Sequence, residues 1–129
     1  MAFDIWHVAI PVKDLDKSVD FYCGTLGFVL IGRDDIASKK QAFVAVRKGG
    51  FSLELFQPTA FVESPRMPDH LAFECEDLQQ FRTTLAGRGL DTSKVAEYDN
   101  GVQQLRLSDP DGVTLDFFQG RKLYEDMIS

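Results

Sequence analysis

The sequence contains one pattern written twice, and this duplication limits the folds open to the chain. Residues 7–15, HVAIPVKDL, and residues 70–78, HLAFECEDL, place a histidine, an alanine and an Asp-Leu pair at the same internal spacing. The two units also end alike, with GFSLELFQ at 50–57 and GVTLDFFQ at 112–119. Agreement at both ends of the unit indicates an internal duplication. We therefore interpret the chain as two repeats, at residues 1–57 and 69–119. Residues 58–68 are the linker between them, and residues 121–129 are a tail.

Each repeat opens with the pattern of a strand followed by a helix. Apolar residues alternate with period two in HVAIPV and HLAFEC, which is typical of a strand with one buried face. Asp14 and Asp77 stand where helix N-caps are expected. Glycines follow both predicted helices and are expected to end them, at positions 24 and 27 and at positions 87 and 89.

The rest of each repeat predicts further strands. Residues 41–46 and 51–56 form one predicted hairpin, and residues 102–107 and 113–118 form its counterpart around the turn SDPDG. Residues 29–40 are expected to hold another strand followed by a loop. The sequence thus predicts an α+β fold with two βαβββ modules in tandem.

Composition narrows the function classes. At 129 residues, with 44% hydrophobic and 26% charged residues, the chain is expected to form one globular domain over residues 1–120. A net charge of −6 argues against nucleic acid as a partner. Without an apolar run near 18 residues or a signal-like N-terminus, we expect no membrane insertion and a cytoplasmic location. Two cysteines are too few for a disulfide scaffold.

Four polar residues occupy equivalent strand positions in the two repeats. His7 and His70 stand opposite the core face of the opening strands, and Glu54 and Asp116 stand opposite the core face of the closing strands. A lone strand histidine is more often structural, but the chain has only two histidines and both fall at one repeat position. If the repeats pack about a pseudo-twofold axis, the four converge. Imidazole and carboxylate together suit one divalent metal, Ni, Zn, Mn, Co or Fe.

Residues of the same predicted strand faces are candidates for a substrate pocket, namely Phe43, Ala45, Phe56, Gln104, Arg106 and Phe118. Two interpretations of Arg106 are open: it holds an anionic group of a substrate, or it pairs with a neighbouring acidic residue.

The sequence resembles the vicinal oxygen chelate superfamily, which includes glyoxalase I, methylmalonyl-CoA epimerase, extradiol dioxygenases and bleomycin- and fosfomycin-resistance proteins. The matching segments are HVAIPVKDLDKSVDFYCGTLGF, LELFQP, PDHLAFECEDL and LSDPDGVTLDFFQ. In overall look the chain is most similar to small bacterial glyoxalase I-like proteins. The resemblance implies two βαβββ modules that form a cupped mixed sheet around a metal, often in a homodimer.

The resemblance also implies roles for single residues. The family's metal ligands fall on His7, Glu54, His70 and Asp116, where Asp116 replaces the usual glutamate. A small carbonyl or hemithioacetal substrate would be chelated, with Glu54 as the first candidate base for proton transfer and Asp116 as the second. This favours a metal-dependent lyase or isomerase of the lactoylglutathione lyase kind. The alternatives are an acyl-CoA or sugar epimerase, an Fe(II) extradiol-type dioxygenase using His7, His70 and Asp116, and a non-catalytic drug-binding protein.

Overall fold

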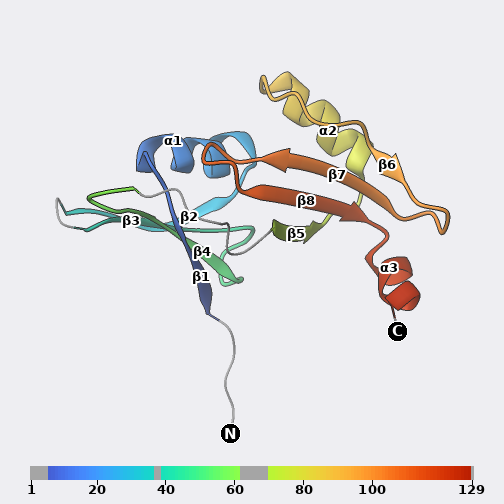
Figure 1. The fold of residues 1–129 in the computed structure, drawn as a ribbon, viewed down its shortest axis with the longest axis horizontal. Coiled ribbons are helices and arrows are strands. Elements are labelled where there is room, and N and C mark those ends of the chain that lie inside the picture. Colours follow the sequence, from blue (N-terminus) through green and yellow to red (C-terminus); the bar gives the residue numbers. More distant parts are fainter. Residues whose placement is uncertain (1–5, 37–38, 62–69, 129) are drawn as a thin grey trace, which may run out of the picture. The chain divides into compact units, whose positions relative to one another are not determined.

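The computed structural model describes residues 6–36, 39–61 and 70–128, and the chain divides into two compact units, Met1–Ser64 and Pro65–Ser129. The first unit contains, in chain order, β1 (His7–Pro11), α1 (Leu15–Val19), the π-helical turn η1 (Asp20–Thr25), β2 (Val29–Ile36), β3 (Lys39–Ala45) and β4 (Ser52–Gln57). The second contains β5 (His70–Glu74), α2 (Leu78–Gly87), β6 (Ala96–Glu97), β7 (Gln103–Ser108), β8 (Thr114–Gln119) and α3 (Arg121–Ile128) (Figure 1). Residues 62–68 of the predicted linker lie outside the described residues.

Each unit folds into one four-stranded mixed sheet, with the same topology in both. The strand orders are β1-β4-β3-β2 and β5-β8-β7-β6. β1 pairs with β4 in parallel, as β5 does with β8, and the other pairs are antiparallel. The predicted α+β class with two βαβββ modules is therefore confirmed. That the two sheets join into one cup stays a prediction.

A helix covers one face of each sheet, and the core lies between them. In the first unit the buried side chains of β3 and β4 include Ala42, Val44, Leu53 and Leu55, and α1 contributes Leu15 and Val19. In the second unit Leu115 and Phe117 of β8 are buried, and the Phe117 ring lies 4.7 Å from that of Phe81 on α2. The alternation expected from the sequence thus places the core on the helix side.

The repeated glutamines explain part of the duplication, because each ties a helix to its own sheet. The Leu15 backbone N–H donates to Gln57 Oε1 at 2.8 Å, and the Leu78 N–H donates to Gln119 Oε1 at 2.8 Å. The predicted N-caps also form: Asp14 accepts from the N–H of Lys17, and Asp77 accepts from that of Gln80. Side chains therefore satisfy two of the N–H groups that each helix leaves open at its start.

The helix ends differ in part from the sequence expectation. The glycines at 24 and 87 do not stop the helices, because η1 continues to Thr25 and α2 includes Gly87. Gly27 and Gly89 do stop them, with φ of 82° and 83°. After α2 the Leu90 N–H donates to the Leu85 carbonyl and the Gly89 N–H to the Ala86 carbonyl, a Schellman ending that requires a left-handed residue.

Three further elements complete the comparison with the sequence. The strand expected within 29–40 is β2, but β3 already begins at Lys39, so the expected loop is restricted to residues 37–38, outside the described residues. The short strand β6 lies in a segment where no strand was predicted. The tail forms α3, whose Tyr124 ring lies 5.3 Å from Phe118 of the same unit.

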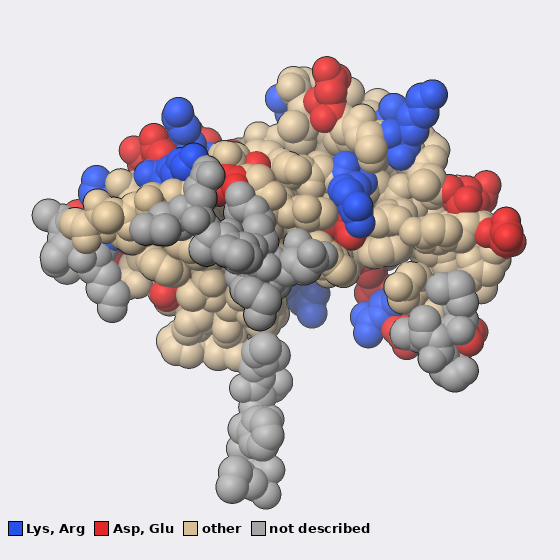
Figure 2. Space-filling view, in the orientation of Figure 1, with Lys and Arg blue, Asp and Glu red and all other residues tan. Residues whose placement is uncertain are grey.

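None of the helices in the described ranges is long and apolar enough to cross a membrane. On the face shown in Figure 2, Lys and Arg side chains are scattered among Asp and Glu.

Candidate metal and substrate site

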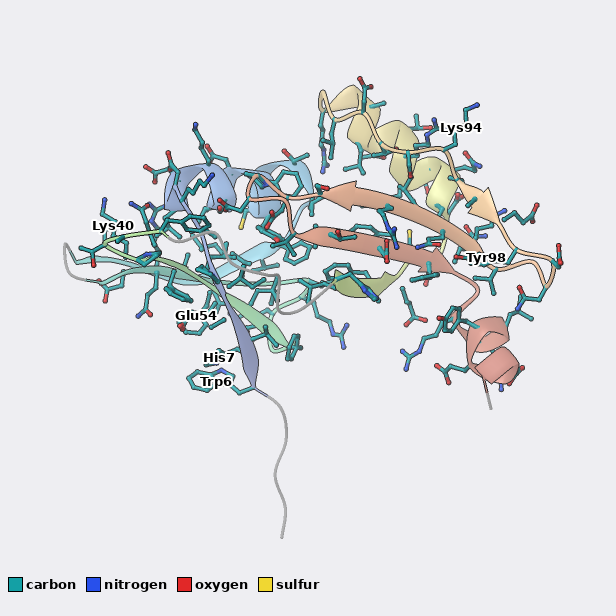
Figure 3. The ribbon with its side chains drawn as sticks, in the orientation of Figure 1. Trp6, His7, Lys40, Glu54, Lys94 and Tyr98 are labelled. Carbon is teal, nitrogen blue, oxygen red and sulfur yellow. The ribbon has the colours of Figure 1, made fainter. Side chains whose placement is uncertain are left out.

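The four predicted metal ligands form two equivalent pairs, one in each unit. His7 on β1 and Glu54 on β4 lie on the side of their sheet away from α1 (Figure 3). The register places Ala9 beside Glu54 and, in the second unit, Ala72 beside Asp116. The small alanine side chain leaves room beside each carboxylate. Each unit therefore brings one imidazole and one carboxylate together.

The first pair is partly buried among aromatic rings. His7 Nε2 lies 3.9 Å from Glu54 Oε2, too far for a hydrogen bond, and the side chains are 21% and 18% exposed. The His7 ring packs edge-on against Phe43 and against Trp6, whose indole also stacks on Phe43 and is 70% exposed. His7 Nδ1 is buried and has no hydrogen-bond partner among the described residues. Such an orphaned nitrogen is costly to bury.

In the second pair, the carboxylate of Asp116 is hydrogen-bonded by an arginine, Arg106. His70 Nε2 lies 4.0 Å from Asp116 Oδ2, and the Asp116 side chain is almost fully buried. Arg106 Nε donates to Asp116 Oδ1 at 2.7 Å and Arg106 Nη2 donates to Oδ2 at 3.1 Å. The Tyr98 hydroxyl donates to Gln104 Oε1, which orients the Gln104 amide whose side chain hydrogen-bonds Asp116. Of the two interpretations of Arg106, the structure therefore shows the pairing with a neighbouring acid.

These contacts set the charge of Asp116. Burial by itself raises the pKa of the Asp116 carboxyl, but the hydrogen bonds from Arg106 and Gln104 outweigh it, and the charges of Arg106 and His70 add to them. The net result is a pKa below the ordinary value. Asp116 is therefore ionised at neutral pH, as the counter-ion of a guanidinium.

The predicted substrate residues divide between the two units. Phe43 and Phe56 are half-buried beside Glu54, and Ala45 is buried. Gln104 and Arg106 both contact Asp116, and Phe118 lies across the strand pair from Gln104. Within the second unit, Phe118 and His70 line a pocket of about 300 Å³.

The pocket is also lined by residues that the sequence did not indicate. These are Ala72, Phe73 and Glu74 of β5 and Arg121, Tyr124 and Glu125 of α3. Ala72 and Glu74 follow His70 at alternate positions, so strand periodicity was a usable signal for these two. The sequence of the tail contains no comparable signal that α3 borders this face.

The donor chemistry fits a divalent metal at three of the four predicted residues. His7, Glu54 and His70 offer imidazole nitrogens and a carboxylate, which are common ligands of Zn, Ni, Mn, Co and Fe. Asp116 fits less well, because both of its oxygens already accept hydrogen bonds from Arg106. Within residues 6–36, 39–61 and 70–128, no three such side chains lie together as a group that could hold a metal ion.

Comparison with known proteins identifies the family. The model of the glyoxalase/bleomycin resistance protein/dioxygenase superfamily matches residues 4–117. The chain belongs to this superfamily. Among the superfamily's curated members, the chain is 28% identical to Glyoxylase I 4 of Arabidopsis thaliana, over 85% of this chain and 67% of that protein. It is 25% identical to a probable lactoylglutathione lyase of Vibrio cholerae, over 93% of each.

Solved structures of the superfamily share the fold. A glyoxalase family protein from Enterococcus faecalis aligns with a TM-score of 0.73 at 27% identity, covering 90% of this chain and 97% of the other. The antibiotic binding protein TnmS3 from Streptomyces aligns with a TM-score of 0.70 at 25% identity, covering 92% and 98%. The named relatives thus include both proteins called glyoxalases and a binding protein.

Proposed function

We propose that this protein is a metal-dependent lyase or isomerase of the glyoxalase I type, acting on a small carbonyl or hemithioacetal substrate. The observation that carries the proposal is the repetition of one imidazole–carboxylate pair at the same strand positions in both units. Two relatives named glyoxylase I and lactoylglutathione lyase support it. We further propose a homodimer in the cytoplasm as the working form.

In this proposal, His7, Glu54 and His70 hold one divalent metal ion, with Asp116 as the fourth predicted ligand. The metal would supply Lewis-acid chemistry to a substrate carbonyl. Glu54 removes a proton from the carbon next to that carbonyl and returns it to the adjacent carbon. Its surroundings suit this work, because the carboxylate lies beside Phe43 and His7 and has no hydrogen bond within the described part of the chain.

A second candidate function is the binding of a small organic ligand without catalysis. The bidentate pair of Arg106 with Asp116 favours it, because a carboxylate that already has a cationic partner has less to offer a metal. The exposed Trp6 indole stacked on Phe43 is a surface on which a flat ligand could lie. The likeness to an antibiotic binding protein is consistent with this candidate.

Metal content distinguishes the two candidates. The wild-type protein and His70→Ala are loaded separately with Ni, Zn, Mn, Co and Fe(II), freed of unbound ions and examined by elemental analysis. The lyase proposal expects near-stoichiometric metal in the wild type, its loss in His70→Ala, and isomerisation of a hemithioacetal by the loaded wild type. Absence of metal under every loading would reject the lyase and favour the binding protein. Iron-dependent oxygen uptake would instead indicate a dioxygenase.

A further inference from the structure

The two equivalent carboxylates, Glu54 and Asp116, have different neighbours across their strand pairs. In the first unit, the residue opposite Glu54 across the β3–β4 pair is Phe43. In the second, the residue opposite Asp116 across the β7–β8 pair is Arg106. An apolar ring thus faces one carboxylate, and a cation faces the other. The two repeats therefore share an acidic residue at this position but differ in the residue opposite it, Phe43 or Arg106.

The change in neighbour fixes Asp116. Arg106 binds it through two parallel N–H···O contacts of 2.7 and 3.1 Å, and Asp116 is 1% exposed. Bidentate charge-assisted pairs are among the strongest side-chain contacts in proteins. A dication at the same carboxylate would lie close to the guanidinium and be repelled by it. Binding a metal through Asp116 would therefore require this pair to separate first.

Glu54 has no such cationic partner in the described ranges of the chain. Among the described residues His7 Nε2 lies 3.9 Å from its carboxylate, and no donor within the described part of the chain occupies its oxygens. Its side chain is 18% exposed, so it is partly desolvated but still accessible. The longer glutamate arm also leaves the carboxylate more freedom to turn than Asp116 has.

We infer that Asp116 is the fixed counter-ion of Arg106 and lies outside the ligand set, which leaves Glu54 as the one carboxylate of the site that binds metal and moves a proton. The statement about metal and proton rests on the function proposed above. Arg106 is then a positioning residue: it acts through Asp116 and holds a positive charge at the second half of the site.

A single mobile carboxylate restricts the reaction class. When Glu54 takes the C–H proton, the C–H electron pair becomes the second bond between the two carbons, and the carbonyl oxygen takes the negative charge. Return of that proton to the former carbonyl carbon, while the hydroxyl proton of the first carbon passes to the negative oxygen, gives an isomer with no oxidant needed. Inversion at one carbon would instead need a proton delivered to the opposite face by a second group. On this inference, Glu54 alone suffices for the isomerisation.

Calorimetric titration with Ni²⁺ tests the ligand set, using the wild type, Glu54→Gln and Asp116→Asn. Glu54→Gln is expected to weaken binding more than about 100-fold, since even outer partners of ligands cost about 10–100-fold. Asp116→Asn is expected to weaken it by less than the roughly tenfold minimum for such partners, because Asp116 hydrogen-bonds Arg106 and Gln104 rather than a predicted ligand. A tenfold or greater loss in Asp116→Asn would overturn the inference.

Urea unfolding tests the ion pair without any metal. Arg106→Met and Asp116→Asn should each lower the urea concentration at the midpoint of unfolding. The midpoint of the double variant should be no lower than that of the less stable single variant, because both substitutions remove the same contact. The exposed Arg47→Met variant is the matched control, expected to keep the wild-type midpoint. Additive shifts would overturn the inference. If the wild type binds none of the five metals under any loading, the proposed lyase fails, while this cycle still decides whether Arg106 holds Asp116.

Discussion

Asp116 is the residue whose ionisation is most closely tied to the fold. It is buried, it accepts two hydrogen bonds from Arg106, and its pKa is lower in the folded protein than the ordinary value of about 3.9. A group whose pKa is lowered by folding stabilises the fold above its unfolded pKa. That contribution is lost as the pH falls through the folded pKa.

We therefore predict that acid removes the advantage of the wild type over Asp116→Asn. The difference in free energy of unfolding should be constant above about pH 5 and shrink below about pH 4, where Asp116 becomes protonated in the unfolded and then in the folded chain. Urea unfolding at several pH values between 7 and 3 measures it. Asp91→Asn, at an exposed position, is the control with little change expected. A difference that is independent of pH would contradict the prediction.

At this scale the sequence predicted faces better than contacts. Strand alternation placed Glu54 and Asp116 opposite the core, and the buried Leu53, Leu55 and Leu115 agree with it. Alternation does not fix a side-chain rotamer, so it could not decide whether Arg106 faces a substrate or an acid. That choice depends on the register of β7 against β8, which sets Arg106 beside Asp116.

At the scale of elements, the two glycines at the end of α2 offer a matched pair. Gly87 is helical, while Gly89 has φ of 83°, and an added Cβ would meet nothing within 4 Å at either position. Gly87→Ala should stabilise the protein by up to about 1 kcal/mol through helix propensity. Gly89→Ala should destabilise it by about 1–2 kcal/mol, the usual cost of a left-handed residue with a Cβ. Urea unfolding at one pH measures both, and shifts of the same sign would contradict the assignment of the helix end.

Element types were predictable here because each repeat carries its own periodicity and caps. The boundaries were less so: the sequence offered four glycines as helix stops, and only Gly27 and Gly89 have the positive φ that ends a helix. The two-residue strand β6 was missed, because Ala96 and Glu97 show no alternation and owe their conformation to pairing with β7.

At the scale of the whole molecule, the proposed metal ligands come from both units. If one metal binds to His7, Glu54 and His70, each histidine should be needed for metal-dependent stabilisation. At a free metal concentration of 100 times Kd, binding adds about 2.7 kcal/mol to the free energy of unfolding. We predict that both His7→Ala and His70→Ala lose the rise in Tm that metal gives the wild type. Thermal unfolding with metal and with a chelator measures this.

The controls for this prediction are the chelated samples, in which each variant reports its own stability without metal. A rise in Tm that survives in one histidine variant would mean that a single unit binds the metal on its own. The duplication suggested joint binding from sequence alone, on the condition that the two repeats pack about a pseudo-twofold axis. How the two units assemble depends on surfaces between modules, which a repeat pattern within one chain does not encode.

The strand order has a consequence for the exchange of amide hydrogens with solvent. Both histidines lie on edge strands of their own sheets, β1 and β5, whereas both carboxylates lie on interior strands, β4 and β8. An edge strand is hydrogen-bonded on one side only and exchanges its amide hydrogens with solvent more readily than an interior strand. A metal ion bound by both His7 and Glu54 would link the edge strand β1 to its neighbour β4. Slowed deuterium uptake in β1 would then report occupancy of the site before any substrate is known.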